Sequence, residues 1–329
     1  MIVGGQVQGT VTNQSGGTFS HTNGTITGGL DNSGGALLSG GTINSTVTNQ
    51  SNGTFTATNE NFKSALNTAG ITTLTTSTVA GIVTNTGTFT ASKTAMVQDV
   101  VNSGAALINN NSTIGGNLTM QQGSSTTLSA TVAGTMQANG GTFQVLQAGA
   151  QAASLSGASD GTLSGPLTLT NAQDTYAGSL SGPGSLAITG GTEVLTGANT
   201  YTGTTTLKNG TLQLGDGGET GTLDNTSAIE NDGTLTLNHS NTLTLAQTIS
   251  GSGALNQIGS GTTIISGQNS YTGPTTVTAG TLDVTGSIGN SAVTVQNGAT
   301  LAGTGAVGTT DIQQNATVAP TGPTGVLTV

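Results

Sequence analysis

Short stretches in which apolar and hydroxyl residues alternate recur along the whole chain. Clear examples are residues 167–170, 234–238, 243–245 and 293–295. This alternation has the period of a β-strand with one buried and one solvated face. Pairs such as Asn209-Gly210 and Asp232-Gly233 separate the stretches, and such residues accept the positive φ of a tight corner. The pattern predicts an all-β chain of short strands joined by tight turns.

An asparagine returns at nearly constant intervals in the first third of the chain, each time one or two positions after an apolar residue. Its members, at successive spacings of 19, 17, 18, 18 and 17 positions, are Asn13, Asn32, Asn49, Asn67, Asn85 and Asn102. A fixed period is typical of repeat architectures, in which each unit buries its apolar face against its neighbours. We therefore predict a parallel β-helix (β-solenoid) with about 18 residues and three short strands per coil. Strand twist favours a right-handed coil.

The asparagine column has two interpretations. Its side-chain amides could form a ladder, each bonded to the amide one coil above and one coil below. Alternatively, asparagine could be present because it tolerates left-handed backbone at a turn. The ladder is the favoured interpretation.

A second, longer period appears in the C-terminal half, with a spacing of 70 positions. Residues 195–203 return as 265–273, and residues 210–214 return as 280–284. Asn32 and Asn102 are also 70 positions apart, so four coils per period predict one geometry for both halves. We expect one continuous solenoid, with an asparagine-marked segment at 1–145, a junction at 146–160 and a segment of 70-residue repeats at 161–329. Residues 59–66 and 147–155 break the strand pattern and predict a helical turn or a protruding loop.

Composition limits the possible partners. The chain has 329 residues, a net charge of −10 and 55 glycines, but 32% of its residues are apolar and placed in alternation, which favours a folded chain over a disordered one. Its only side-chain cations are Lys63, Lys93 and Lys208, which cannot form a surface for nucleic acid. There is no cysteine, and no apolar run approaches the length of a membrane-spanning helix. The start lacks a signal peptide, so we expect an excised segment.

Two segments resemble a known repeat. Residues 195–214 and 265–284 are similar to the autotransporter-associated strand repeat of bacterial autotransporter passenger regions. A third part, residues 299–307 and 316–329, resembles the stretch that often closes such passengers. The resemblance implies a right-handed parallel β-helix that is secreted to the cell surface, with an outer-membrane translocator barrel as its partner in the full-length precursor. In that family the repeat is a scaffold and export element, so no ligand residue is transferred to this chain.

Candidate binding residues are few. Tyr176, Tyr201 and Tyr271 share one sequence context and could form a ligand-stacking strip, but the surrounding turn residues favour a structural corner. Asp216, Glu219 and Asp224 form a weak candidate site for Ca²⁺. They lack the glycine-rich nonapeptide of calcium β-rolls, which favours solvated turns. We predict no cofactor.

Candidate catalytic residues are equally sparse. Glu230 and Asp232 would share a strand face and could serve as the acid and base of a polysaccharide-cleaving enzyme. The chain has no Trp and no Arg to line a substrate groove, which disfavours this interpretation. Ser33 faintly resembles a serine nucleophile with His21 or His239 as the base, but it aligns with Ser103 in the repeat and is interpreted as a coil corner.

The favoured function is a non-enzymatic, extracellular rod with a structural and adhesive role. Its ligands would lie on host surfaces or neighbouring cells, or would be further copies of itself. One alternative is a subunit of an extracellular filament formed by end-to-end stacking, which the apolar ends at 1–3 and 326–329 leave open. The other, less favoured, is a polysaccharide-active enzyme on the same scaffold.

Overall fold

The computed structural model describes residues 1–321 and 327–328, and within them it contains β-strands, turns and bends but no helix. Contacts divide the chain into two units, Met1–Gly161 and Thr162–Val329. Residues 322–326 and 329, which belong to the predicted closing stretch and the apolar C-terminal end, lie outside the described residues.

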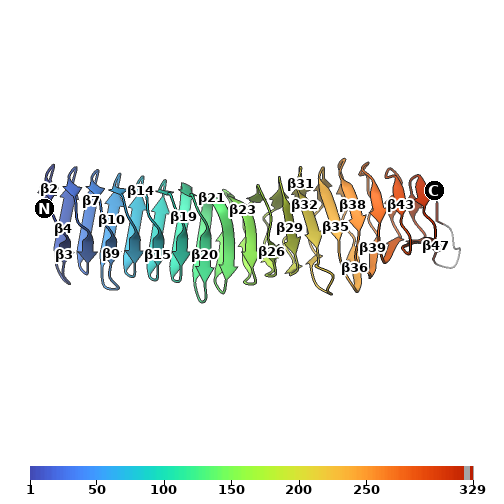
Figure 1. Ribbon diagram of the computed structural model, residues 1–329, viewed down its shortest axis with the longest axis horizontal. Coiled ribbons are helices and arrows are strands. Elements are labelled where there is room, and N and C mark those ends of the chain that lie inside the picture. The colour runs from blue at the N-terminus through green and yellow to red at the C-terminus, as the bar shows by residue number, and fades with distance from the viewer. Residues whose placement is uncertain (322–326, 329) are drawn as a thin grey trace. The chain divides into compact units, whose positions relative to one another are not determined.

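Unit 1 is a stack of coils, each built from three strands (Figure 1). The longer strands are β4 (Thr18–Thr22), β7 (Gly35–Ser39), β10 (Thr54–Thr58), β13 (Ile71–Thr75), β16 (Thr88–Ser92), β19 (Ala105–Ile114), β21 (Ser125–Asn139), β22 (Thr142–Val145) and β23 (Ala150–Gly157). The short second strands are β2 (Gln6–Val7), β5 (Thr25–Ile26), β8 (Thr42–Ile43), β11 (Asn61–Phe62), β14 (Thr78–Val79) and β17 (Ala95–Met96). The third strands are β3 (Val11–Asn13), β6 (Leu30–Asn32), β9 (Val47–Asn49), β12 (Leu66–Thr68), β15 (Val83–Asn85), β18 (Val100–Asn102) and β20 (Leu118–Gln121), and β1 (Ile2–Val3) precedes them all.

The strands of unit 1 form parallel ladders with the equivalent strands of successive coils. Val11 pairs with Leu30, 19 positions on, and Leu30 pairs with Val47, 17 positions on. Leu66 pairs in turn with Val47 and with Val83. The prediction of an all-β parallel solenoid with three short strands per coil, and with a coil length close to the spacing of the asparagines, is therefore confirmed.

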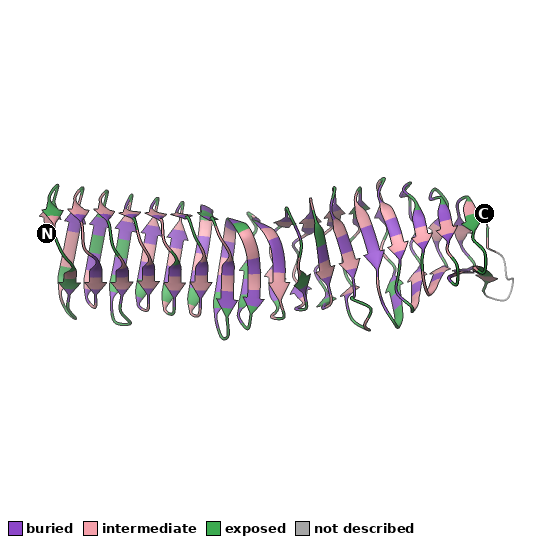
Figure 2. Cartoon of the chain, in the orientation of Figure 1, coloured by how far each residue is buried: buried purple, intermediate pink, exposed green. Residues whose placement is uncertain are grey.

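The core lies inside each coil, where apolar side chains from successive coils stack in columns. Ile26, Ile43, Phe62 and Val79 form one such column, and each is 0% exposed. The alternation of buried and more exposed positions along the strands is visible in Figure 2. Burying one such side chain gives roughly 2 kcal/mol, whereas fixing each residue's backbone costs about 1–2 kcal/mol, so a coil is stable only against its neighbours.

The expected helical turn or loop is wrong for both stretches that break the alternating pattern. Residues 59–66 contain β11 and the start of β12, with a positive φ of 53° at Asn59. Residues 147–155 contain the first part of β23, which pairs in parallel with β21. In residues 59–66 the corner at Asn59 breaks the apolar–polar alternation, and in residues 147–155 a run of small residues does so. Neither feature interrupts the coil.

Unit 2 is also a parallel solenoid, and β24 (Gly161–Leu163) lies at the division between the units. Its strands up to Gln257 are β25 (Leu167–Leu169), β26 (Thr175–Tyr176), β27 (Leu180–Ser181), β28 (Leu186–Ile188), β29 (Thr192–Leu195), β30 (Ala198–Asn199), β31 (Thr205–Leu207), β32 (Thr211–Leu214), β33 (Thr222–Leu223), β34 (Ile229–Asn231), β35 (Thr234–Leu237), β36 (Thr242–Leu245), β37 (Ile249–Ser250) and β38 (Ala254–Gln257). The remainder are β39 (Thr262–Ile265), β40 (Thr275–Val277), β41 (Thr281–Val284), β42 (Ser287–Ile288), β43 (Val293–Val295), β44 (Thr300–Gly303), β45 (Ala306–Val307), β46 (Thr310–Ile312) and β47 (Thr317–Pro320).

The coils of unit 2 vary more in length than predicted. Thr205 pairs with Ile229, 24 positions on, whereas Val293 pairs with Thr310, 17 positions on. The longer coil accommodates residues 215–221, where three glycines have positive φ values of 78°, 97° and 108°. Such backbone suits glycine because it has no Cβ.

The interpretation of the longer period as four coils is correct in unit 1 and wrong in unit 2. In unit 1, four pairings lead from Asn32 to Asn102. In unit 2, the column of Leu195 continues through Leu214, Leu237 and Gln257 and reaches Val277 after four coils. Ile265, the sequence equivalent of Leu195, lies instead in β39, which pairs with β36 and β41. The two repeat copies therefore occupy different columns.

Candidate functional site

The asparagines of unit 1 form a buried column of hydrogen bonds. The Nδ2 of Asn13 donates to the Oδ1 of Asn32 at 2.7 Å, and Asn32 donates to Asn49 at 2.8 Å. Asn85 donates in the same way to Asn102 at 2.7 Å. Each amide also donates to a backbone carbonyl of the following coil, as Asn32 does to Thr54 at 3.1 Å. The column thus ties successive coils together through side chains as well as backbone.

The prediction is wrong at Asn67, which lies outside the column. Strand β12 pairs Asn67 with Thr48 and places Thr68 opposite Asn49. The hydroxyl of Thr68 donates to the Oδ1 of Asn85 at 2.7 Å, so threonine takes the position of the fourth asparagine. The amide of Asn49 donates instead to the hydroxyl of Thr72 at 3.0 Å. The sequence misleads here because Leu66 is followed directly by an asparagine, which shifts its side chain to the outward face.

The asparagines of the column do not have left-handed backbone. In the described part of the chain, the asparagines with positive φ are Asn23, Asn59, Asn110, Asn111 and Asn315, all outside the column. The column members lie in strands and are between 0% and 8% exposed. Their side-chain hydrogen bonds, and not their tolerance of positive φ, account for asparagine at these positions.

The three tyrosine rings are buried, so none offers a face for ligand stacking. Tyr176 is 0% exposed, and Tyr201 and Tyr271 are each 1% exposed. The hydroxyl of Tyr201 lies 2.5 Å from the Oγ1 of Thr205, and that of Tyr271 lies 2.6 Å from the Oγ1 of Thr275. Burial raises the pKa of the Tyr201 and Tyr271 phenols, against the opposing effect of these hydrogen bonds, so both phenols remain protonated.

Two buried asparagines, Asn199 and Asn269, were missed by the sequence analysis, and each lies two positions before a buried tyrosine. The Oδ1 of Asn199 accepts from the amide of Leu180 at 3.0 Å, and that of Asn269 accepts from the amide of Ile249 at 2.7 Å. Each side chain also donates to the carbonyl two residues before it. The signal was present, because the two asparagines hold the same position in residues 195–203 and 265–273. At these corners the asparagine side chains form hydrogen bonds with backbone amides and carbonyls inside the coil.

The structure does not gather the acidic candidates into a metal site. Asp216, Glu219 and Asp224 are all exposed. The carboxylate of Asp216 accepts a hydrogen bond from the amide of Gly218 in its own turn, at 3.1 Å. Within the described ranges, no group of three or more His, Cys, Asp or Glu side chains could hold a metal ion.

Glu230 and Asp232 are both exposed; Glu230 is the middle residue of β34, and Asp232 directly follows the strand. The carboxylate of Asp232 accepts two hydrogen bonds from Ser252, from its amide at 2.8 Å and its hydroxyl at 2.9 Å. These bonds, the amide foremost, lower the pKa of Asp232. A general acid requires a raised pKa, so this carboxylate suits a turn cap and not proton donation.

Five strands of unit 1 present an uncharged outer surface, which we call the threonine face. It consists of the first, third and fifth residues of β4, β7, β10, β13 and β16, which pair in register in three ranks. The ranks are Thr18, Gly35, Thr54, Ile71 and Thr88; Ser20, Leu37, Thr56, Thr73 and Thr90; and Thr22, Ser39, Thr58, Thr75 and Ser92. Neighbouring strands lie about 4.8 Å apart, so hydroxyl groups recur at that spacing along the whole third rank, whereas Gly35, Ile71 and Leu37 interrupt the other two.

The threonine face also exposes apolar groups. Leu37 and Ile71 are each 56% exposed. A hollow of about 460 Å³ lies over β4, β7 and β10, lined in part by Phe19, Leu37 and Thr54. The sequence analysis did not identify this face, although the recurrence of hydroxyl residues in 54–58, 71–75 and 88–92 signals it. A neutral surface of hydroxyl and apolar groups is suited to contact with another uncharged surface.

In the described ranges, no helix has the length and apolar character needed to cross a membrane. No curated protein matches the chain. A family profile, the Passenger-associated-transport-repeat, matches residues 190–214 and 255–284. Both matches contain the buried corner described above, with Asn199 and Tyr201 in the first and Asn269 and Tyr271 in the second. The matched repeats and the parallel β-solenoid that carries them support the identification of this chain as an autotransporter passenger region.

Proposed function

We propose that this chain is a non-enzymatic, extracellular structural and adhesive solenoid that contacts its partners through the threonine face. The passenger-associated repeat implies a translocator partner in the precursor and secretion to the cell surface. The adhesive role is inferred from the surface of unit 1.

The neutrality of the threonine face carries this proposal. None of its fifteen positions holds a charged residue, although the chain has a net charge of −10. An uncharged array avoids the desolvation of ions on contact, and hydroxyl groups can both donate and accept hydrogen bonds. Repetition along the coils allows many weak contacts to act together, which raises the overall strength of binding without a deep pocket.

The proposed partners are uncharged surfaces of host or neighbouring cells, or further copies of the chain. Catalysis at Glu230 and Asp232 does not enter the proposal, because the lowered pKa of Asp232 keeps that side chain ionised and hydrogen-bonded to Ser252. Its position fits a corner that holds two coils together.

Lysine substitutions on two neighbouring sheets test the proposal. The test variant carries Thr56→Lys, Thr73→Lys and Thr90→Lys, in the central rank of the threonine face. The control carries Thr48→Lys, Asn67→Lys and Thr84→Lys, which pair in register on the outward side of β9, β12 and β15. Both variants add three positive charges at three successive coils.

The measurement is the adhesion of beads coated with each variant to cells and to one another. We expect the test variant to lose at least about tenfold in adhesion, because three desolvated ammonium groups oppose contact. The control should adhere like the unmodified chain. If both variants adhere as well as the unmodified chain, the assignment of the threonine face is refuted. If both lose adhesion to the same extent, the loss is a nonspecific effect of charge, which contradicts the assignment as well.

A further inference from the structure

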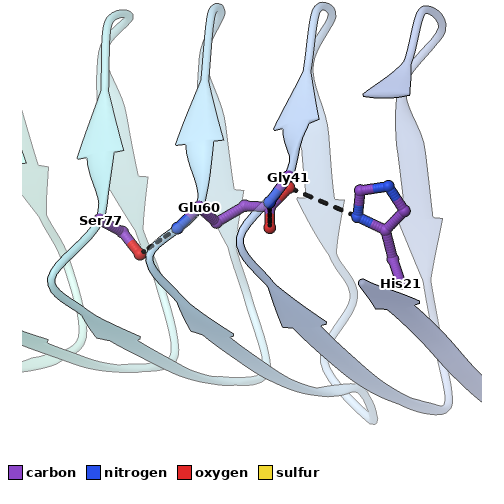
Figure 3. Close-up of polar contacts among 4 residues, drawn as sticks. All are labelled: His21, Gly41, Glu60 and Ser77. Atoms are coloured by element: carbon purple, nitrogen blue, oxygen red, sulfur yellow. Dashed lines mark hydrogen bonds and ion pairs between the residues drawn. The ribbon is translucent and has the colours of Figure 1, made fainter. Parts of the chain in front are cut away.

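A histidine and a glutamate are paired inside the first coils of unit 1 (Figure 3). His21 is the fourth residue of β4, and Glu60 directly precedes β11. Both side chains are 0% exposed, and the Nδ1 of His21 lies 3.5 Å from the Oε1 of Glu60. The two residues belong to coils that are two apart, and Gly41 lies between them.

The pair departs from the residues that occupy its two columns elsewhere. His21 pairs with Ile2 and Leu38, both apolar. The register that pairs β11 with β14 aligns Glu60 with the smaller Ser77. Nothing in the apolar core requires ionisable groups at these positions, so their presence needs a separate explanation.

Two glycines make room for the pair. A Cβ at Gly41 would lie 2.2 Å from the Cε1 of His21, and a Cβ at Gly24 would lie 2.9 Å from its Nε2. Any larger residue at Gly41 would therefore displace the imidazole ring. The coil below Glu60 is shaped to accept the ring and to let the glutamate reach it.

Only part of the pair is hydrogen-bonded. The Oε2 of Glu60 accepts from the amide of Gly41 at 2.9 Å, and the amide of Glu60 donates to the hydroxyl of Ser77 at 3.1 Å. Both ring nitrogens of His21 and the Oε1 of Glu60 are buried and have no hydrogen-bond partner among the described residues. An unpaired charge on either side chain would be costly in this setting.

Burial shifts the two groups in opposite directions. It raises the pKa of Glu60 to about 7, with the Gly41 amide acting against it. It lowers the pKa of His21. Each shift favours the neutral form, which is the form that burial stabilises.

We propose that His21 and Glu60 hold a single proton between them and thereby keep the opening equilibrium of the first coils constant across weakly acidic pH. In the opened chain, one proton is also held between pH 4.5 and 6.5, the ordinary pKa values of glutamate and histidine. Opening then takes up and releases no proton, so its equilibrium does not depend on pH in that range.

Either residue alone should make the coils sensitive to pH. The contribution of Glu60 is fully present below pH 4.5 and is lost as the pH rises through about 7. The contribution of His21 is present above pH 6.5 and is lost as the pH falls through its lowered pKa. The two slopes are opposite and offset each other in the pair.

No other titratable side chain occurs in the strands that surround the pair, namely β1, β5, β7, β8, β10, β11, β13 and β14. Lys63 directly follows β11 and is exposed, and the amino group of Met1 precedes β1. Asp31 in β6 accepts a hydrogen bond from Gln50 at 2.8 Å. These groups are common to all the variants below, so differences between variants report the pair.

The test is hydrogen exchange of residues 18–62 in the full chain between pH 5 and 6.5, with rates divided by the intrinsic rates at each pH. The variants are His21→Leu, which matches Leu38 in the same column, Glu60→Ser, which matches Ser77, and the double substitution. The unmodified chain and the double variant should show constant protection. His21→Leu should lose about tenfold in protection per unit of rising pH, and Glu60→Ser should lose protection as the pH falls.

Two results would overturn the proposal. One is a flat profile in both single variants, and the other is a tenfold change per pH unit in the unmodified chain. The NMR titration of the His21 ring in the unmodified chain tests the proposal without substitution, so it remains decisive if a single variant fails to fold. We expect no titration of the ring near pH 6.5. An ordinary histidine titration curve would contradict a buried pair that holds one proton in total.

Discussion

Replacing Asn32 with alanine removes the amide that lies between Asn13 and Asn49 in the buried column of unit 1. Asn32 is 0% exposed. Its loss takes the acceptor from the Nδ2 of Asn13, at 2.7 Å, and the donor from the Oδ1 of Asn49, at 2.8 Å. It also removes a donor from the carbonyl of Thr54, at 3.1 Å. No water can replace these bonds without entering the coil.

The expected cost follows from the partners that remain. A buried polar group left without its hydrogen bond costs about 1–3 kcal/mol, so two amide partners give a loss of about 2–6 kcal/mol. Asn13 keeps a bond to the carbonyl of Gly35, at 3.1 Å, which favours the lower half of that range. A loss of about 3 kcal/mol corresponds to roughly 100-fold in the opening equilibrium of these coils.

Two substitutions serve as controls. Asn67→Ala removes the same amide from a half-buried position outside the column, and should change stability by less than about 0.5 kcal/mol. Asn32→Thr should cost less than Asn32→Ala, because Thr68 shows that a hydroxyl in this column can donate to the next asparagine.

Hydrogen exchange of residues 30–58, read by mass spectrometry at fixed pH, measures the effect locally. We expect protection to fall about 100-fold in Asn32→Ala and to stay unchanged in Asn67→Ala. Similar losses in the two variants would refute the reasoning, because the column would then contribute no more than an ordinary amide.

Three further predictions concern unit 2. Tyr271→Phe removes one hydrogen bond of the Thr275 hydroxyl, which keeps Ser291 as its other buried partner. The substitution should cost about 0.5–1.5 kcal/mol, measured by local hydrogen exchange against Tyr271→Leu as a control for ring packing. The lowered pKa of Asp232 means that its contribution to stability is present above its ordinary pKa of 3.8 and is lost as the pH falls through the folded value. The protection of the Ser252 amide, taken relative to its intrinsic exchange rate at each pH, should therefore fall in acid, and Asp232→Asn should abolish that pH dependence. Because Asp216, Glu219 and Asp224 remain exposed and separate, millimolar Ca²⁺ should leave the melting temperature unchanged, and a rise that Asp216→Asn abolishes would contradict this.

The sequence predicted the stacking of unit 1 because each coil repeats one chemical feature at one position. Asn13, Asn32 and Asn49 are spaced as successive coils require. The one error within the asparagine column, Asn67, arose from a one-residue shift, and in a strand such a shift moves a side chain to the opposite face. A period can therefore identify a coil and still misplace one of its members.

The sequence was less informative about unit 2, for a geometric reason. The longer period fits four short coils, but residues 215–221 lengthen one coil to 24 positions. The second copy of the repeat then begins in a different strand column. Repeat length alone does not specify how many turns a repeat spans.

The His21–Glu60 pair could not be predicted from local sequence. His21 lies within β4, whereas Glu60 follows β10. The two side chains meet only because β4, β7 and β10 stack as successive coils. The threonine face was in principle visible, but alternation alone does not reveal which of three outward faces is free of charge. Both features depend on the register of the coils.

Cysteine cross-linking tests the parallel stacking most directly, because the chain contains no cysteine of its own. Thr56 and Thr73 are paired in register on adjacent strands, about 4.8 Å apart, within the range of a disulfide. Thr90 lies one coil further on, at about twice that distance. The account predicts that the Thr56→Cys, Thr73→Cys variant forms an intramolecular disulfide under mild oxidation and that the Thr56→Cys, Thr90→Cys variant does not. Efficient cross-linking of the second variant and none of the first would contradict the parallel solenoid.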